Sequence, residues 1–148
     1  MKTVKQLLAS KPNQALYSIT PKATVFEALQ LMADGDVGSL LVMDGDKLVG
    51  LFTERDYARK IILQGKASAS TVIGDVMIEK VAFVKPTQTL EQCMIIMASL
   101  RVRYLPVMED KTVLGILSIT DLVREQIADQ QFTIEQLEHY IHGWSLAQ

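Results

Sequence analysis

The chain has 148 residues, of which 49% are hydrophobic and 22% charged, and its formal net charge is −2. This length and composition are typical of one globular domain or two small fused units. The chain does not have the net positive charge that attracts a protein to nucleic acid or anionic membranes. No apolar run reaches the roughly 18–20 residues of a membrane span, and the single cysteine, Cys93, excludes an intramolecular disulfide framework. With no apolar leader at its start, the sequence predicts a cytoplasmic protein whose partners include neither membrane nor nucleic acid.

The first half of the chain predicts the element order β-α-β-β-α. A short strand at residues 16–19 precedes a helix that begins at Thr24, where a hydroxyl and a carboxylate three residues later have the spacing of a capping box. Apolar runs at residues 39–43 and 48–52, separated by a glycine-containing turn, predict a β-hairpin. A second helix is expected to begin at Thr53.

The second half of the chain repeats the first. When the sequence is shifted by 65 residues, residues 21–59 superpose on 86–124 without a gap, and eleven of the 39 positions are identical. Such a repeat indicates a supersecondary unit that needs its copy to bury its apolar face, so any cleft between the copies should exist in two pseudo-symmetric versions. The second copy is expected to contain strands at residues 81–84, 104–108 and 113–117 and helices that begin at Thr89 and Ser118.

Three further segments connect and flank the copies. Residues 3–8 and 71–77 predict matching lead-in helices, and residues 64–70, which are small and polar, predict a linker. The expected division is a first repeat with its lead-in helix at residues 1–66, a second repeat at residues 67–130 and a helical tail at residues 131–148.

The tail after Arg124 has no counterpart in the first half and predicts one more helix. Thr133 and Gln136 have the spacing of a capping box for this helix. Its narrow apolar stripe could pack on its own domain or on a partner, and it spans too few turns to decide whether a coiled coil forms. The stripe consists of Ile134, Leu137 and Ile141, and Trp144 follows it.

Each copy ends its hairpin with the pattern Gly-h-h-Thr/Ser-x-x-Asp, in which h is apolar. The glycine lets the backbone lie close to whatever fills the cleft, and the hydroxyl stands at a helix N-cap beside N–H groups that suit an anion. The aspartate can accept two hydrogen bonds from a vicinal diol such as that of ribose. The alternative is that hydroxyl and aspartate simply form a capping box. The residues concerned are Gly50, Thr53 and Asp56 in the first copy and Gly115, Ser118 and Asp121 in the second.

Two such motifs at a fixed interval, each preceded by the same helix and hairpin, resemble a tandem pair of cystathionine-β-synthase (CBS) domains, also called a Bateman module. Residues 102–107 are similar to the family's segment that leads into the hairpin, where His is usual in place of Tyr104. The resemblance covers about residues 3–130 and includes stand-alone, single-pair proteins, which the runs at 53–60 and 136–141 resemble. It implies an α+β fold in which two pseudo-symmetric β-α-β-β-α repeats pack sheet to sheet, with a short N-terminal segment and a C-terminal helical tail.

The resemblance also implies a ligand with an adenine base, held by the hairpin start and the first strand of each copy. Plain core packing is the alternative for the apolar residues there, and a solvated surface role is the alternative for the cations. Because only the first motif contains an arginine, the cleft around Thr53, Arg55 and Asp56 is predicted to bind better. The candidate ligand-binding residues are Ile19, Thr20, Val37, Gly38, Ser39, Thr53, Arg55, Asp56, Lys85, Arg101, Arg103, Tyr104, Ser118, Thr120 and Asp121.

These features predict a non-catalytic regulatory or sensor module that binds AMP, ADP, ATP, NAD or S-adenosylmethionine between the repeats. The alternative is a ligand-independent scaffold for protein–protein interaction. An enzyme is disfavoured because no general base, nucleophile or metal cluster accompanies the predicted phosphate site, so we predict no catalytic residue, metal site or catalytic cofactor. The resemblance further implies a face-to-face homodimer and, as another partner, a regulated enzyme.

Overall fold

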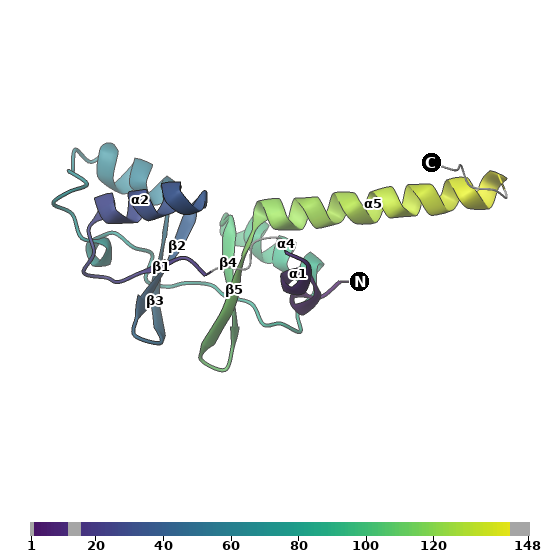
Figure 1. Ribbon diagram of the computed structural model, residues 1–148, viewed down its shortest axis with the longest axis horizontal. Coiled ribbons are helices and arrows are strands. Elements are labelled where there is room, and N and C mark those ends of the chain that lie inside the picture. Colours follow the sequence, from purple (N-terminus) through teal and green to yellow (C-terminus); the bar gives the residue numbers. More distant parts are fainter. Residues whose placement is uncertain (1, 12–15, 143–148) are drawn as a thin grey trace.

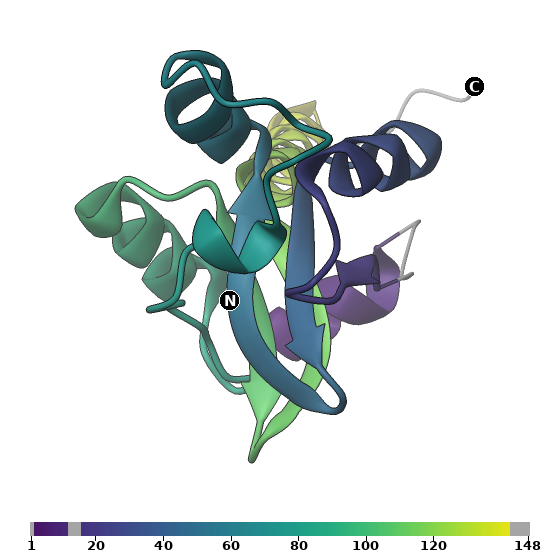
Figure 2. The ribbon, with the colours of Figure 1, turned by 90° about the vertical axis from the view of Figure 1, so that its left-hand side faces the viewer.

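The computed structural model describes residues 2–11 and 16–142 and has the mixed α+β architecture predicted from the sequence (Figure 1). Each half contains an antiparallel hairpin, formed by β2 (Ser39–Asp44) with β3 (Lys47–Thr53) and by β4 (Tyr104–Glu109) with β5 (Thr112–Ser118). Both hairpins have a bulge between the fourth and fifth residues of their first strand. The short β1 (Ser18–Ile19) adds to β2 in parallel. Figure 2 shows the two hairpins one behind the other, so the repeat seen in the sequence is a repeat in space.

The first helix of each repeat, α2 (Val25–Gly35) or α4 (Leu90–Leu100), begins at the predicted threonine cap. The hydroxyls of Thr24 and Thr89 each accept the N–H of the third helical residue, at 3.1 and 3.2 Å. The side chain of Gln92 completes the box by accepting the Thr89 N–H at 3.0 Å. These bonds satisfy N–H groups that have no partner within the helix and so fix where each helix begins.

The two lead-in segments differ in structure. The first forms the predicted helix, α1 (Val4–Ser10), with a capping box at Thr3. The predicted second lead-in helix at residues 71–77 is wrong, because only the short 3₁₀ turn η2 (Ile73–Asp75) forms there. Its N–H groups bond to the first repeat instead of building a longer helix: the Gly74 N–H donates to the Pro21 carbonyl at 2.8 Å.

The lead-in segments are exchanged between the repeats. Helix α1 precedes the first repeat in sequence, yet Val4 and Leu7 lie in the core formed by α4, β4 and β5. Conversely, Ile73 and Val76 precede the second repeat and lie in the core of the first. Backbone hydrogen bonds match this exchange, from Val4 N–H to Gln88 O and from Ile73 N–H to Ala23 O, both at 2.8 Å. The boundaries of the two cores therefore do not coincide with a division of the chain near residue 66.

The glycines of the two hairpin motifs serve this exchange. A Cβ on Gly50 would lie 2.9 Å from the carbonyl oxygen of Ile78, and one on Gly115 would lie 2.8 Å from Cδ2 of Leu8. These glycines therefore let the backbone lie close to the lead-in segments, which fill the space beside them.

A strand predicted at residues 81–84 does not form. Only Val84 pairs, through a single parallel bridge to Val107. The chain then turns away from the hairpin, because the Lys85 N–H donates to the side-chain oxygen of Gln88 at 2.8 Å and Pro86 has no N–H to donate.

The closing helix differs between the repeats. In the first repeat it consists of one turn, α3 (Glu54–Asp56), followed by the π-helical η1 (Tyr57–Ile62). In the second it is α5 (Ile119–His142), one uninterrupted helix that projects from the body of the molecule (Figure 1). The predicted cap at Thr133 is therefore wrong: this residue lies within α5, and its hydroxyl donates to the Asp129 carbonyl at 3.0 Å. Trp144 lies outside the described residues.

Truncation of Leu7 tests the exchange directly. Leu7 is buried in the core of the second repeat, so Leu7→Ala should lower the free energy of unfolding by roughly 2–5 kcal/mol by leaving a cavity. The exposed Lys5 on the same helix provides the control, and Lys5→Ala should change it by less than about 0.5 kcal/mol. Urea denaturation measures both values, and an equal effect of the two substitutions would show that α1 is not part of this core.

Candidate ligand-binding clefts

Two of the clefts between the repeats contain the hairpin motifs, and each of these two is lined by residues of both repeats. The Asp56 cleft has a volume of about 600 Å³ and combines residues 53–56 of the first repeat with residues 102–104 of the second. The Asp121 cleft has a volume of about 570 Å³ and combines Ser118 and Asp121 with residues 37–39 of the first repeat. The segment that leads into each hairpin therefore faces the motif of the other repeat.

Asp56 forms the predicted capping box with Thr53. Its Oδ2 atom accepts the backbone N–H of Thr53 at 2.9 Å and the Thr53 hydroxyl at 2.8 Å. The Thr53 hydroxyl oxygen in turn accepts the Asp56 N–H at 3.2 Å. The other carboxylate oxygen, Oδ1, lies 3.3 Å from Nζ of Lys60, whose side chain is 41% exposed. One oxygen of Asp56 thus bonds to the cap of the helix, and the other faces Lys60, whose Nζ atom also donates to the carbonyl of Val76 at 2.9 Å.

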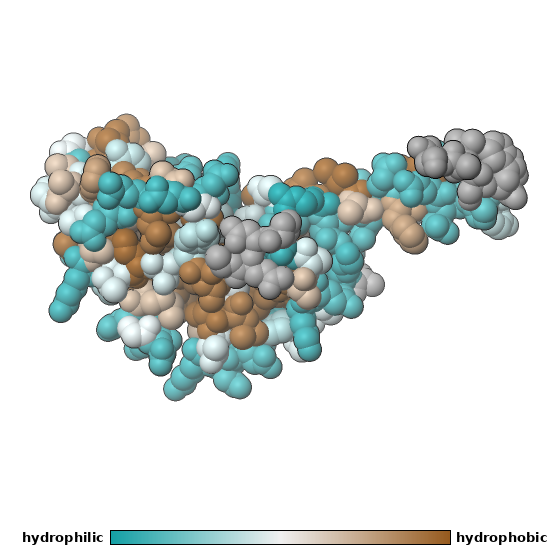
Figure 3. Space-filling view, viewed as in Figure 1, coloured by the Kyte–Doolittle hydropathy of each residue, from teal (hydrophilic) through white to brown (hydrophobic). Residues whose placement is uncertain are grey.

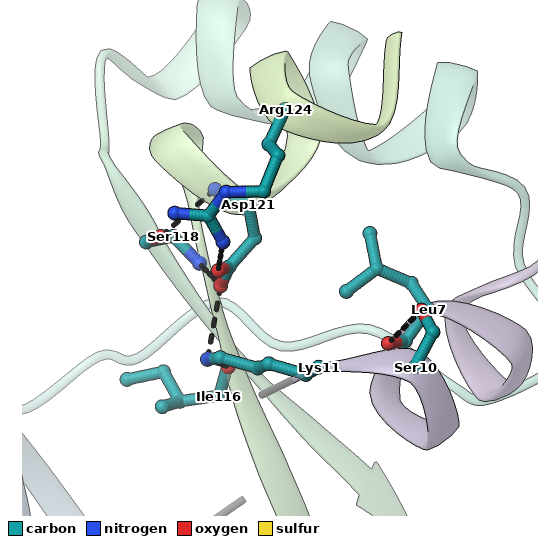
Figure 4. Close-up of polar contacts among 7 residues, drawn as sticks. All are labelled: Leu7, Ser10, Lys11, Ile116, Ser118, Asp121 and Arg124. Carbon is teal, nitrogen blue, oxygen red and sulfur yellow. Dashed lines mark hydrogen bonds and ion pairs between the residues drawn. The ribbon is translucent and has the colours of Figure 1, made fainter. Parts of the chain in front are cut away.

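Asp121 has a different set of partners (Figure 4). Its Oδ2 atom accepts the Ser118 N–H at 2.8 Å and lies 2.9 Å from Nζ of Lys11, which follows helix α1. Lys11 also donates to the Ile116 carbonyl at 2.8 Å, and Arg124 Nη1 lies 3.7 Å from Oδ1 of Asp121. Lys11 is only 18% exposed, so it pairs with this carboxylate out of bulk water, where an ion pair is weakly screened. A ligand diol would have to compete with Lys11 for Asp121.

The helix N-termini at the two motifs offer fewer free N–H groups than the sequence predicts. Besides the Thr53 N–H, the N–H of Glu54 donates to the Gly38 carbonyl at 3.1 Å. The equivalent bond in the second repeat runs from Ile119 N–H to Arg103 O at 2.8 Å. A phosphate in either cleft must therefore be held mainly by cationic side chains rather than by the helix ends.

The charge of the two clefts is unequal. Four cationic side chains and two carboxylates line the Asp56 cleft, whereas two of each line the Asp121 cleft. An anion is therefore favoured in the Asp56 cleft. The charged residues are Arg55, Arg59, Lys60, Arg103, Glu54 and Asp56 in the first, and Lys11, Arg124, Asp36 and Asp121 in the second.

Arg55 and Tyr104 connect the two repeats across the Asp56 cleft. Arg55 Nη1 donates to the carbonyl of Arg101 at 2.8 Å, immediately after helix α4. Tyr104 lines both clefts, and its hydroxyl lies against Gly38 of the first repeat. Burial raises the pKa of Tyr104, with a further contribution from the charge of Glu54, so the phenol stays neutral at physiological pH. It can therefore donate a hydrogen bond without repelling an anion.

The structure brings most of the predicted site residues to these clefts. The exceptions are Ile19, Thr20, Lys85 and Arg101, which line neither. Ile19 packs against the first core, and Lys85 lies in a separate depression beside Phe83. Lining residues not predicted from the sequence include Lys11, Tyr17 and Asp36; nothing in the repeat pointed to Lys11, because its place depends on the exchange of α1.

The chain belongs to the CBS domain family, which matches residues 4–63 and 73–128 and so accounts for both repeats. More particularly, it is similar to the mitochondrial CBS domain-containing protein CBSX3 of Arabidopsis thaliana, with 37% identity over 95% of this chain and 72% of that protein. A putative signal-transduction protein with CBS domains from Burkholderia ambifaria has a similar structure, with a TM-score of 0.85 and 45% identity over 90% of this chain and 99% of that chain. The CBS pair of MJ0100, in complex with 5′-methylthioadenosine and S-adenosyl-L-methionine, shares the fold at a TM-score of 0.74 and 23% identity, over 87% and 98% of the two chains.

Residues 2–11 and 16–142 contain neither a candidate metal site nor a candidate membrane-spanning helix. In these ranges no three His, Cys, Asp or Glu side chains are grouped closely enough to hold a metal ion. No helix in these ranges is long and apolar enough to cross a membrane.

The contact of Gly38 with Tyr104 can be tested by a double-mutant cycle. Gly38→Ala should lower the free energy of unfolding by about 1–3 kcal/mol, because a Cβ there would overlap the Tyr104 hydroxyl. In a Tyr104→Phe background the nearest ring carbon would be 3.3 Å away, so Gly38→Ala should then cost less than half as much. Thermal or urea denaturation of the four proteins measures the coupling, and strictly additive losses would contradict the contact.

Proposed function

We propose that this protein is a non-catalytic regulatory module that binds an adenine nucleotide in the Asp56 cleft. The observation that carries the proposal is the combination of four cationic side chains with an aspartate whose Oδ1 atom faces a partly exposed lysine, in a cleft of about 600 Å³. This volume suits a small-molecule ligand, and the polar groups suit a sugar phosphate. The CBS pair of MJ0100 is in complex with two adenosine derivatives, and this supports the proposal by analogy.

Each part of a nucleotide has a counterpart in this cleft. The Oδ1 atom of Asp56 can accept hydrogen bonds from the ribose hydroxyls once Lys60, whose side chain is 41% exposed, leaves this oxygen and the Val76 carbonyl and turns toward the phosphates. Arg103 and Arg59 provide further charge for the phosphates. The adenine base is assigned to the apolar and aromatic wall of the same cleft, formed by Leu51, Ile78, Val102 and Tyr104.

The charge of the cleft ranks the candidate ligands. AMP, ADP, ATP and NAD carry one or more phosphates, whereas S-adenosylmethionine carries a cationic sulfonium and no phosphate. Four cations against two carboxylates therefore favour the phosphorylated ligands. We place S-adenosylmethionine last among them.

Regulation would follow from the position of the ligand. A nucleotide in the Asp56 cleft would contact both repeats, beside the Arg55 bond that already joins them. Such a ligand favours the relative orientation of the repeats to which it binds more tightly, and a partner that senses this orientation would respond. The proposed partners are a second copy of the chain and a regulated enzyme.

We propose that the homodimer uses the outer faces of the helices. Large apolar side chains lie exposed there on α2 and α4 and at the end of η1, and a contiguous patch of such residues marks an interaction site. The exposed side chains are Phe26, Ile62, Leu63, Ile95 and Leu100.

We also propose a cytoplasmic location, because the single cysteine is buried and free, as is usual in a reducing compartment. The mitochondrial location of CBSX3 is the alternative.

A thermal-shift series with AMP, ADP, ATP, NAD and S-adenosylmethionine tests the proposed function. A phosphorylated adenine ligand should raise the melting temperature, and Asp56→Ala should weaken its binding about 10- to 100-fold by removing charge-assisted hydrogen bonds to ribose. Asp121→Ala is the matched control, since it removes the equivalent cap and should leave this binding within about threefold.

Three results would overturn the assignment. If no adenosine compound raised the melting temperature, the ligand-independent scaffold would be the better explanation. If only Asp121→Ala weakened binding, the other cleft would be the site. Turnover of ATP by the purified protein would contradict a non-catalytic module.

A further inference from the structure

Helix α5 presents one apolar seam along its whole projecting length. Every described residue from Gln126 to Ile141 is exposed, and the helix stands clear of the body in the space-filling view (Figure 3). Five of its exposed apolar side chains, between 48% and 73% exposed, follow one another at alternating intervals of four and three residues when Gln130 is included, whereas Phe132 and Tyr140 lie outside this series. The seam consists of Val123, Ile127, Gln130, Ile134, Leu137 and Ile141.

The spacing of this seam is that of a coiled coil. Its members follow one another at intervals of four and three residues, which is the a/d pattern of a heptad repeat. The continuity of α5 reveals this register, because the seam begins before Thr133, where the sequence had predicted a new helix. Ile127, Ile134 and Ile141 occupy a positions, and Leu137 occupies a d position.

We infer that α5 pairs with the same helix of a second copy as a parallel two-stranded coiled coil. In parallel coiled coils, isoleucine at a with leucine at d favours two strands, as at Ile134 and Leu137. In that arrangement Gln130 of each copy meets its own equivalent, whereas in an antiparallel pair it would face an apolar residue. The proposal is independent of the nucleotide and of the other helix faces.

The residues beside the seam are compatible with self-association. In the parallel pair Gln126 faces Gln131 of the other copy, and Thr133 faces Glu138, so no like charges meet. The carboxylates Asp129 and Glu135 lie on the outer positions. This acidic outer face would be repelled by an anionic membrane, which makes a lipid surface a poor occupant of the seam.

The energetic need for a partner is also clear. Most helical stability in proteins comes from packing an apolar face, and all residues from Gln126 to Ile141 are exposed. Covering the seam on two copies would bury on the order of 1,000 Å², the lower limit of a specific interface. The outer helix is thus expected to be stable only when it is paired.

Disulfide trapping of the full chain tests this pairing. Leu137→Cys places a thiol at a d position, where two parallel copies bring the thiols together, and Gln136→Cys places one on the outer face. Under mild oxidation Leu137→Cys should form a covalent dimer at least tenfold faster than Gln136→Cys. The native Cys93 is buried and common to both variants, so it does not affect the comparison.

A second substitution separates pairing through α5 from dimerisation of the body. Ile134→Glu added to Leu137→Cys should abolish the rapid cross-link and leave the thermal unfolding of the body unchanged. Equal cross-linking rates for Leu137→Cys and Gln136→Cys, or rapid cross-linking that survives Ile134→Glu, would overturn the proposal.

Discussion

The structure depends on the exchange of the two lead-in segments. Helix α1 completes the core of the second repeat, and the segment around η2 completes the core of the first. Neither repeat can therefore leave the other without exposing part of its own core. The clefts between the repeats are lined by residues of both halves, so they persist as long as the two repeats stay packed together.

The same exchange makes the two clefts unequal. Because α1 packs on the second repeat, Lys11 at its end reaches Asp121 and forms an ion pair with its carboxylate. In the Asp56 cleft the nearest cation, Lys60, comes from the local helix and is more exposed. Two motifs of the same pattern thus differ in the ionic partner of their aspartate through a residue that lies outside the repeat.

Much of the fold could be predicted from the sequence because its signals are local. The caps at Thr24 and Thr89 and the two hairpins rest on spacing within a few residues, and the structure has them where they were predicted. The capping-box spacing at Thr133 does not mark the start of a helix, because this residue lies within α5 and its hydroxyl bonds to the backbone of the preceding turn. The role of Lys11 could not be predicted, because it depends on which repeat α1 packs against.

The most direct test of this account is the number of nucleotides bound per chain, measured by isothermal titration calorimetry with the adenine nucleotide that stabilises the protein most. The account predicts one tight site in the wild-type protein and a second site in Lys11→Met, which keeps the apolar stem of the side chain but releases Asp121. Two equal sites in the wild type, or no second site in Lys11→Met, would contradict it.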